Sequence, residues 1–164
     1  MKKIILFGLI LFYSNFYSQG FANGNLKEEN RIKLIEELSS LSGIKIGKTD
    51  TVILNFYIKP ETEPNGSCID YYTNDSSYKR FVKKNKNIVQ FFITEKMYSY
   101  KHGKVIEDKN DEIKNLIFQN AKLCGNYAII KPNGEFIRKY GEYRQDEIPK
   151  LVLQWEPKLM PTAV

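Results

Sequence analysis

The pattern of apolar and polar positions predicts helices in four parts of the chain. Between Leu26 and Leu41, apolar side chains recur every three or four residues, which places them on one face of a helix. Asn25 is expected to cap the start of this helix, and Gly43 is expected to end it. The same spacing predicts three more helices, at about 74–84, 111–122 and 146–156.

Strands are predicted where short apolar runs, rich in β-branched and aromatic residues, lie between turn-forming residues. Residues 51–58 and 87–94 are almost continuously apolar, as in strands that are covered on both faces. Residues 126–131 and 136–140 flank Pro132-Asn133-Gly134, a tight-turn sequence that predicts a hairpin. Residues 95–110 show no clear period and are expected to form a loop or an irregular hairpin.

The order of these elements predicts a single α/β domain over residues 26–156. After the first helix come a strand, a helix, a strand, a helix, a two-stranded hairpin and a final helix. Such an order favours a central mixed β-sheet flanked by helices. Residues 19–25 are expected to be flexible, and residues 157–164 to form a loose C-terminal tail.

The first residues have the layout of a secretory signal peptide. Lys2 and Lys3 precede an uncharged apolar run of about ten residues, and small and polar residues follow around Ser18. A membrane-spanning helix needs about twenty apolar residues. We therefore expect cleavage after Ser18 and export to the periplasm or the medium, without a stable membrane anchor. The alternative is an uncleaved N-terminal anchor.

Removal of this segment would leave a mildly basic protein. The loss of Lys2 and Lys3 lowers the number of Lys and Arg residues from 25 to 23, against 19 Asp and Glu residues. This balance does not indicate binding to nucleic acid. The densest basic run is interpreted as a solvated helix face, with an anionic partner as the alternative; it comprises Lys79, Arg80, Lys83, Lys84 and Lys86.

The sequence has no pattern typical of a metal, cofactor or hydrolytic site. His102 is the only histidine, whereas zinc sites and Ser-His-Asp systems depend on histidine with partners at suitable spacing. There is no phosphate-binding glycine loop and no nucleophile elbow. The carboxylates around the long loop, Glu61, Glu63 and Asp70, are expected to be solvated.

The chain contains two cysteines, Cys68 and Cys124. In an oxidising compartment an even pair most simply forms one disulfide. Because the enclosed loop is long, such a bond would stabilise the fold by about 4 kcal/mol. A redox-active pair and two free thiols are the alternatives.

Two stretches of the sequence resemble the thioredoxin-like superfamily, and most closely its exported TlpA/ResA-type branch. Val52-Ile53-Leu54-Asn55-Phe56-Tyr57 is similar to the strand that leads to the thioredoxin active site. Residues 127–141 are similar to the closing hairpin. The resemblance covers about residues 44–156 and implies a thioredoxin-like three-layer sandwich.

The resemblance also implies that the catalytic parts of the family are missing. The place of the Cys-X-X-Cys dithiol reads Asn65-Gly66-Ser67-Cys68, so an amide stands where the attacking thiol should be. Asn126 takes the place of the cis-proline and is expected to have an ordinary trans peptide bond. Asn55 replaces a buried acid that many thioredoxins have.

In the family's fold, the loop before the cis-proline strand faces the active-site loop. The resemblance therefore places Cys68 close to Cys124. The candidate site consists of the former active-site loop and its facing wall, which are Asn65, Gly66, Ser67, Gly125 and Asn126.

Our interpretation is a binding or scaffold module, without a cofactor, that uses this face for an unknown protein or peptide partner. Fold and activity are separable, so the fold alone does not imply catalysis. Tyr71 and Tyr72, close to Cys68, are candidates for partner contact. The alternatives are an atypical thiol–disulfide oxidoreductase that uses Cys68 and Cys124, and a structural envelope protein with no ligand.

Overall fold

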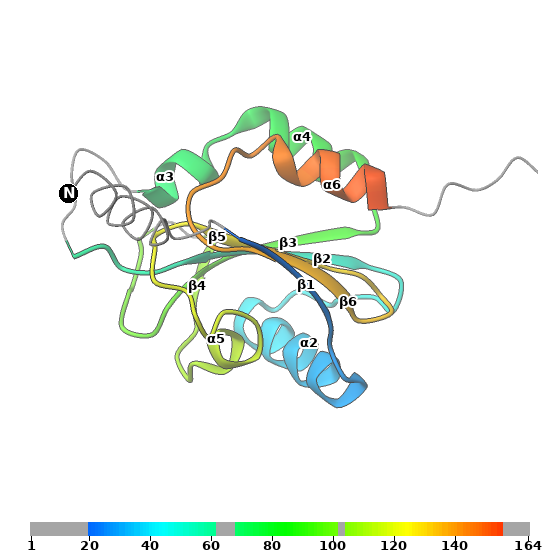
Figure 1. Ribbon diagram of the computed structural model, residues 1–164, viewed down its shortest axis with the longest axis horizontal. Coiled ribbons are helices and arrows are strands. Elements are labelled where there is room, and N and C mark those ends of the chain that lie inside the picture. Colours follow the sequence, from blue (N-terminus) through cyan, green and yellow to red (C-terminus); the bar gives the residue numbers. More distant parts are fainter. Residues whose placement is uncertain (1–19, 62–67, 102–103, 156–164) are drawn as a thin grey trace, which may run out of the picture.

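The chain folds around a mixed β-sheet with helices on both of its faces (Figure 1). The structure, a computed structural model, describes residues 20–61, 68–101 and 104–155. The signal peptide and the C-terminal tail expected from the sequence lie outside these ranges, as do His102 and residues 65–67 of the candidate site. The α/β class, with a central mixed sheet between helices, is confirmed.

Six strands form the sheet: β1 (Phe21–Asn25), β2 (Thr51–Tyr57), β3 (Ile88–Thr94), β4 (Val105–Glu107), β5 (Asn126–Ile130) and β6 (Glu135–Lys139). Their order is β1-β6-β5-β2-β3-β4. β2 is parallel to β3, and β3 to β4, whereas the other neighbouring pairs are antiparallel. Every residue of β2 after Thr51 is buried, as its apolar run predicted.

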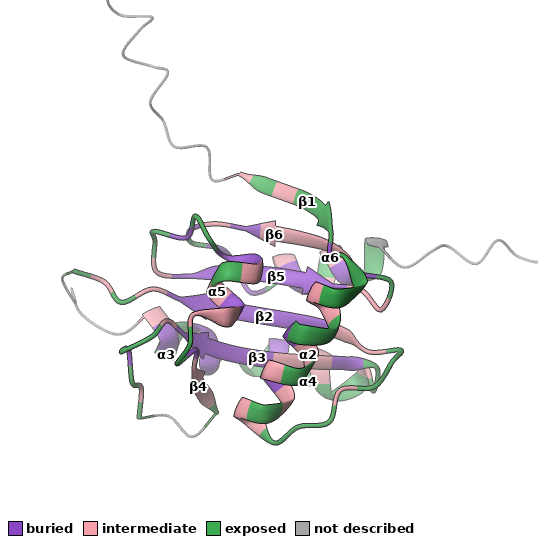
Figure 2. Cartoon of the chain, turned by 90° about the horizontal axis from the view of Figure 1, so that it is seen from below, coloured by how far each residue is buried: buried purple, intermediate pink, exposed green. Residues whose placement is uncertain are grey.

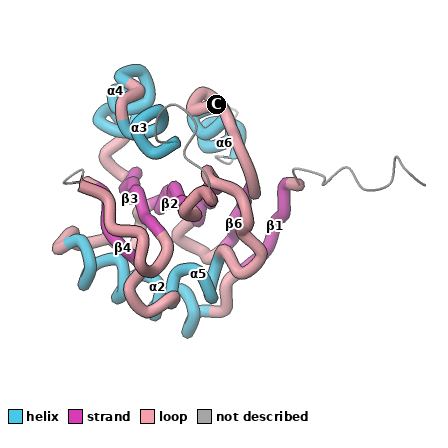
Figure 3. The backbone as a smooth tube through the Cα atoms, turned by 90° about the vertical axis from the view of Figure 1, so that its left-hand side faces the viewer, coloured by secondary structure: helices cyan, strands magenta, loops and turns pink. Residues whose placement is uncertain are grey.

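Five helices in the described ranges cover the sheet: α2 (Glu28–Ser42), α3 (Cys68–Thr73), α4 (Ser76–Lys84), α5 (Glu112–Ile117) and α6 (Glu147–Trp155). α2 and α5 lie on one face, and α3, α4 and α6 on the other, as Figures 1 and 3 both show. None of these helices has the length and apolar character needed to cross a lipid bilayer.

The two faces of the sheet carry chemically different cores. On the side of α2 and α5 the core is aliphatic and phenylalanine-rich, with Phe56 stacked on Phe118 at 4.8 Å between ring centroids. On the side of α3, α4 and α6 it is rich in tyrosine; the buried tyrosines there are Tyr57, Tyr72, Tyr78, Tyr98, Tyr127 and Tyr143. Tyrosine fills space as phenylalanine does, but each hydroxyl that it buries also needs a hydrogen-bond partner.

Most of the strands and helices predicted from the sequence are confirmed, and their ends are where the differences lie. Gly43 ends α2 as predicted, with a left-handed φ of 71° and its N–H donated to the Ser39 carbonyl at 2.9 Å. The cap assigned to Asn25 is wrong, because α2 begins at Glu28 and Asn25 pairs with Glu135 in the sheet. α5 ends at Ile117, five residues before the predicted end at Lys122.

The start of the domain corrects the prediction that residues 19–25 are flexible. Phe21–Asn25 form β1, which pairs antiparallel with β6 from Phe21↔Lys139 to Asn25↔Glu135. Figure 2 shows β1 as a mostly exposed strand at the edge of the sheet, separated by β6 from the buried central strands. Because an edge strand is held by backbone hydrogen bonds rather than by a buried apolar face, its sequence carries no apolar pattern.

Two further elements were not predicted. Residues 105–107 form β4, a short strand parallel to β3, within the region expected to be a loop or hairpin. A separate short helix, α3, begins at Cys68, ahead of the helix predicted at about 74–84. That helix is α4; Asp75 caps it by accepting the Tyr78 N–H at 2.8 Å. The basic run on and after α4 is solvent-exposed, as interpreted from the sequence.

A buried carboxylate fixes the start of α5. The Asp108 side chain is fully buried and accepts the N–H groups of Ile113, at 3.3 Å, and Lys114, at 2.8 Å. Asp111, at the cap position itself, has a left-handed φ of 57° and makes no side-chain cap. Asp108 therefore satisfies amides that a helix start otherwise leaves unpaired.

The buried position of Asp108 predicts a measurable pH effect. Burial raises the pKa of this carboxyl, and the hydrogen bonds from Lys114 and Ile113 only partly offset the increase. Because the folded pKa is the higher one, the folded protein holds the proton at a pH where the unfolded chain has lost it. The contribution of Asp108 to the free energy of unfolding should therefore rise as the pH falls through the folded pKa. NMR titration of the carboxyl carbon measures this pKa; a midpoint at or below that of an unfolded aspartate would contradict the expectation.

Candidate functional site

A disulfide between Cys68 and Cys124 joins the first residue of α3 to the loop before β5. Its Cα atoms lie 6.5 Å apart, although the residues are separated by 56 positions in the sequence. Both residues are half-buried and pack against the tyrosine-rich core. The pairing that the resemblance implied is thus confirmed, and the alternative of two free thiols is wrong.

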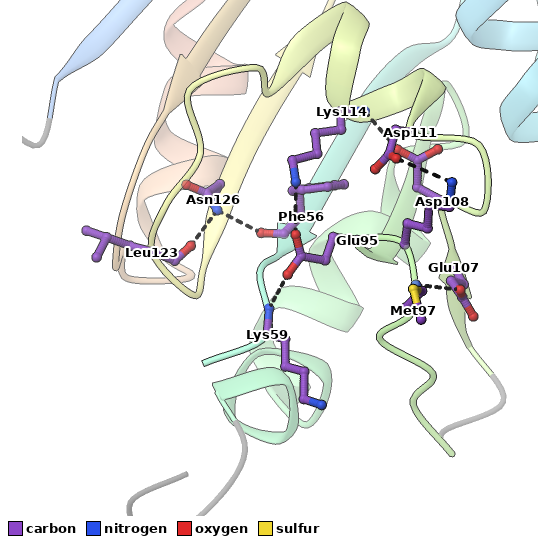
Figure 4. Close-up of polar contacts among 11 residues, drawn as sticks. Phe56, Lys59, Glu95, Met97, Glu107, Asp108, Asp111, Lys114, Leu123 and Asn126 are labelled. Atoms are coloured by element: carbon purple, nitrogen blue, oxygen red, sulfur yellow. Dashed lines mark hydrogen bonds and ion pairs between the residues drawn. The ribbon is translucent and has the colours of Figure 1, made fainter. Parts of the chain in front are cut away.

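Asn126, on the facing wall of the candidate site, holds three backbone segments together. Its side-chain amide donates to the carbonyls of Phe56, at 3.2 Å, and Leu123, at 2.8 Å, and its side-chain oxygen accepts the Gly141 N–H at 3.1 Å. Figure 4 shows the first two contacts. Asn126 is fully buried, and no peptide bond of the described residues is cis, as expected for this position. The residue therefore fixes the backbone beside the disulfide.

Gly125 is required by its backbone conformation and by close packing. Its φ of 81° is a left-handed value that residues with a Cβ adopt at a cost. A Cβ placed there would also lie 3.2 Å from the Tyr72 ring and hydroxyl. The loop that carries Cys124 can therefore approach α3 this closely only with glycine at position 125.

Tyr72 connects α3 to the segment between β6 and α6. Its hydroxyl accepts the Tyr143 N–H at 3.2 Å, and its carbonyl accepts the Gln145 side-chain amide at 2.6 Å. The ring stacks on Tyr143, with centroids 4.3 Å apart and planes 14° from parallel. These contacts fix α3, and with it Cys68, against the rest of the domain.

A chain of buried side-chain hydrogen bonds leads from this stack into the sheet. The Asn55 amide donates to the Tyr143 hydroxyl, and the Asn55 oxygen accepts the Gln90 side-chain amide at 2.6 Å. Asn55 is a fully buried amide in an otherwise largely apolar strand. Its hydrogen bonds to Tyr143 and Gln90 therefore give it a structural role.

The buried polar side chains that the structure describes next to the disulfide are neutral at physiological pH. Burial raises the pKa of both the Tyr72 and the Tyr143 phenol above that of a free tyrosine. Asn126 and Asn55 do not titrate. A set of fixed neutral groups can hold backbone and side chains in place, but it supplies no general base to activate a thiol.

Exposure separates the two tyrosines proposed for partner contact. Tyr71 is 68% exposed, whereas Tyr72 is only 4% exposed and packs inside the domain. The proposal of Tyr72 as a contact residue is therefore wrong. Leu123, beside Cys124, was not considered in the sequence and is 52% exposed.

A second polar cluster at this end of the sheet was also not recognised in the sequence. Glu95 follows β3; its carboxylate accepts the Lys59 N–H at 2.8 Å and the Lys114 ammonium at 2.9 Å (Figure 4). Its own N–H donates to the Tyr57 carbonyl at 3.0 Å. The ends of β2 and β3 are thus tied to α5. No local sequence signal marks Glu95, because the partners of its carboxylate come from other parts of the chain.

In residues 20–61, 68–101 and 104–155, no group of three or more His, Cys, Asp or Glu side chains has an arrangement that could hold a metal ion. Asn65, Gly66 and Ser67 lie outside these ranges, so the candidate site consists here of the disulfide, Gly125, Asn126 and the Tyr72–Tyr143 stack.

Replacement of Asn126 should show how strongly it holds the site together. Asn126→Ala leaves the buried Phe56 carbonyl, the partly buried Leu123 carbonyl and the buried Gly141 N–H without this partner. Since an unsatisfied buried polar group costs about 1–3 kcal/mol, we expect a loss of about 3 kcal/mol in unfolding free energy. Denaturant unfolding measures the loss. The matched control is Asn120→Ala, at an exposed position, with an expected change below about 0.5 kcal/mol. Equal stability of the two variants would contradict this role.

Comparison with known proteins gives no independent assignment. No model of a known protein family matches the sequence. No curated protein matches it closely enough to count as a relative.

Proposed function

We propose that this chain is an exported protein whose thioredoxin-like domain lacks a catalytic dithiol and serves as a non-catalytic binding or scaffold module. The order of elements supports the thioredoxin-like interpretation. β2, α4, β3, α5, the β5–β6 hairpin and α6 come in the expected order, with α3 added before α4 and β4 added between β3 and α5. The parallel pairing of β2 with β3, and the antiparallel hairpin beside β2, are consistent with it.

The Cys68–Cys124 disulfide is the observation that carries the non-catalytic part of the proposal. A thioredoxin-type enzyme attacks with one activated thiol and resolves the mixed disulfide with a second thiol from the same motif. Here the two sulfurs come from different elements and are bonded to each other. The surrounding contacts of Asn126, Gly125 and Tyr72 hold both elements in place, which favours a structural cross-link.

The exposed side chains next to the cross-link support a binding role. Tyr71 lies one helical turn after Cys68, and Leu123 lies one residue before Cys124. An exposed tyrosine and leucine on rigidly held backbone can contact a partner without a large cost in side-chain and backbone order. We propose that they contribute to the surface for a protein or peptide partner.

The alternative is an atypical thiol–disulfide oxidoreductase that cycles Cys68 and Cys124. One observation favours it: both cysteines retain part of their surface, so the bond is not sealed in the core. Such an enzyme would need a disulfide that is readily reduced, which distinguishes it from a structural cross-link.

Equilibration in redox buffers separates the two functions. For a structural cross-link we expect a reduction potential below about −300 mV, whereas a potential above about −230 mV would overturn the non-catalytic proposal. The double variant Cys68→Ser/Cys124→Ser should keep the fold, seen by circular dichroism, and lose about 4 kcal/mol of unfolding free energy. Faster oxidation of a dithiol peptide by glutathione disulfide in the presence of the unmodified protein, an acceleration that is abolished in the double variant, would establish the enzyme instead.

Export is tested by the mass of the protein made in a bacterial host. We expect the periplasmic or secreted fraction to contain a chain that starts at Gln19. Leu9→Lys interrupts the apolar run before the cut and should leave the uncleaved chain in the cells. Recovery of the full-length chain from the membrane fraction, still beginning at Met1, would support the uncleaved anchor.

A further inference from the structure

Strand β1 has one edge that no described residue covers. It is the terminal strand of the sheet and, within the described part of the chain, pairs only with β6 (Figure 2). An uncovered edge presents backbone N–H and C=O groups that can pair with another strand, and many proteins protect such edges with charged residues, proline or bulges. β1 reads Phe-Ala-Asn-Gly-Asn and has none of these protections.

The opposite edge of the sheet is protected in the usual way. β4 has only three residues and ends in Glu107. The Glu107 carboxylate accepts the Met97 N–H at 2.8 Å, so it stays beside the strand. The two edges therefore differ, and only the one at β1 is uncharged along its whole length.

The pairing of β1 with β6 fixes which backbone groups point outward. The N–H of Leu26 donates to the Gly134 carbonyl at 2.9 Å, which continues the register of the strand pair. Hydrogen-bonded pairs alternate along antiparallel strands, so Gly24 and Ala22 also direct their backbone groups at β6. The backbone N–H and C=O groups of Phe21, Asn23 and Asn25 therefore point away from the sheet.

These outward groups are complementary to a second copy of themselves. In an antiparallel pair with its two-fold axis at Asn23, Phe21 lies opposite the Asn25 of the second copy, and Asn23 lies opposite Asn23. Every outward N–H then meets an outward C=O. On the other face of the strand, Ala22 lies opposite Gly24, so no large side chains collide there.

The side chains beside β1 leave this edge accessible and keep it rigid. Phe21 lies 5.3 Å from the Lys139 ammonium, which is itself paired with Glu147 of α6 at 2.8 Å. On the other face, the Phe136 ring covers Gly24 so closely that a Cβ there would lie 2.5 Å from it. Both contacts hold β1 on β6 and leave its outer edge open.

We propose that β1 is a self-association site, through which two copies of this chain pair edge to edge about a two-fold axis and form one continuous sheet. The two-fold axis makes the contact close on itself, so that a dimer results rather than a filament. The contact is small and built mainly from backbone hydrogen bonds, so the dimer is weak and depends on concentration. It would carry two copies of the surface at Tyr71 and Leu123, and the proposal does not rest on what that surface binds.

Charges placed on the two-fold axis test the proposal. Sedimentation velocity on the unmodified protein, from micromolar to millimolar concentration, should show the average mass rise from one chain towards two. Asn23→Lys and Asn23→Glu each put like charges opposite one another, and each protein alone should remain monomeric over the same range. A mixture of the two variants should dimerise again, because opposite charges then face each other.

Matched controls keep the result unambiguous. Asn87→Lys and Asn87→Glu introduce the same charges at an exposed turn before β3, away from β1, and should dimerise as the unmodified protein does. Circular dichroism checks that all variants fold. An unmodified protein that stays monomeric at millimolar concentration would overturn the proposal, as would association that survives in both Asn23 variants or a mixture that stays monomeric.

Discussion

Burial of β2 on both faces is the constraint on which the rest of this structure depends. β2 lies between a parallel neighbour, β3, and an antiparallel neighbour, β5, and all of its residues after Thr51 are buried. A strand of this kind needs a layer of helices on each face. α2 and α5 supply one layer, and α3, α4 and α6 supply the other (Figure 3). The layered architecture follows from this single apolar run.

The two layers use different chemistry, and the difference locates the candidate site. The layer of α2 and α5 has an apolar core, which is tolerant of sequence as long as volume is kept, and its polar contacts, such as Glu95–Lys114, lie around that core. The tyrosine-rich layer also contains directional contacts, from Gln90 through Asn55 to Tyr143 and on to Tyr72. Directional contacts specify one arrangement of the backbone. The disulfide joins the two segments that these contacts position.

The contacts around the disulfide hold the backbone in place and do not activate a thiol. Asn126 bonds to the backbone of three segments, Gly125 allows close approach to Tyr72, and burial keeps the nearby phenols protonated. A redox site needs the opposite: an accessible thiol whose pKa is lowered by its surroundings. This contrast is why a binding or scaffold role is favoured over disulfide exchange, and why the exposed Tyr71 and Leu123 become the residues of interest.

Sequence by itself determined the elements with a strong apolar period: α2, α4 and α6, the strands β2 and β3, and the β5–β6 hairpin. It also determined the α/β class, because the order of those elements restricts how they can pack. Only the tertiary structure showed which segments form the two edge strands of the sheet. β1 and β4 are held by backbone pairing, and an uncovered or half-covered strand needs no apolar repeat that a sequence pattern could reveal.

The candidate site divides in the same way. That Cys68 and Cys124 form a pair could be expected from their number and from the family resemblance. The partners of Asn126, Tyr72 and Glu95 could not, because their hydrogen bonds join segments far apart in the chain, and a side chain's type does not say which backbone groups will face it. Likewise, only the packed structure could show that of two adjacent tyrosines one is buried and the other exposed. The sequence shows local periodicity directly, whereas hydrogen bonds between distant segments depend on how the helix layers pack on the sheet.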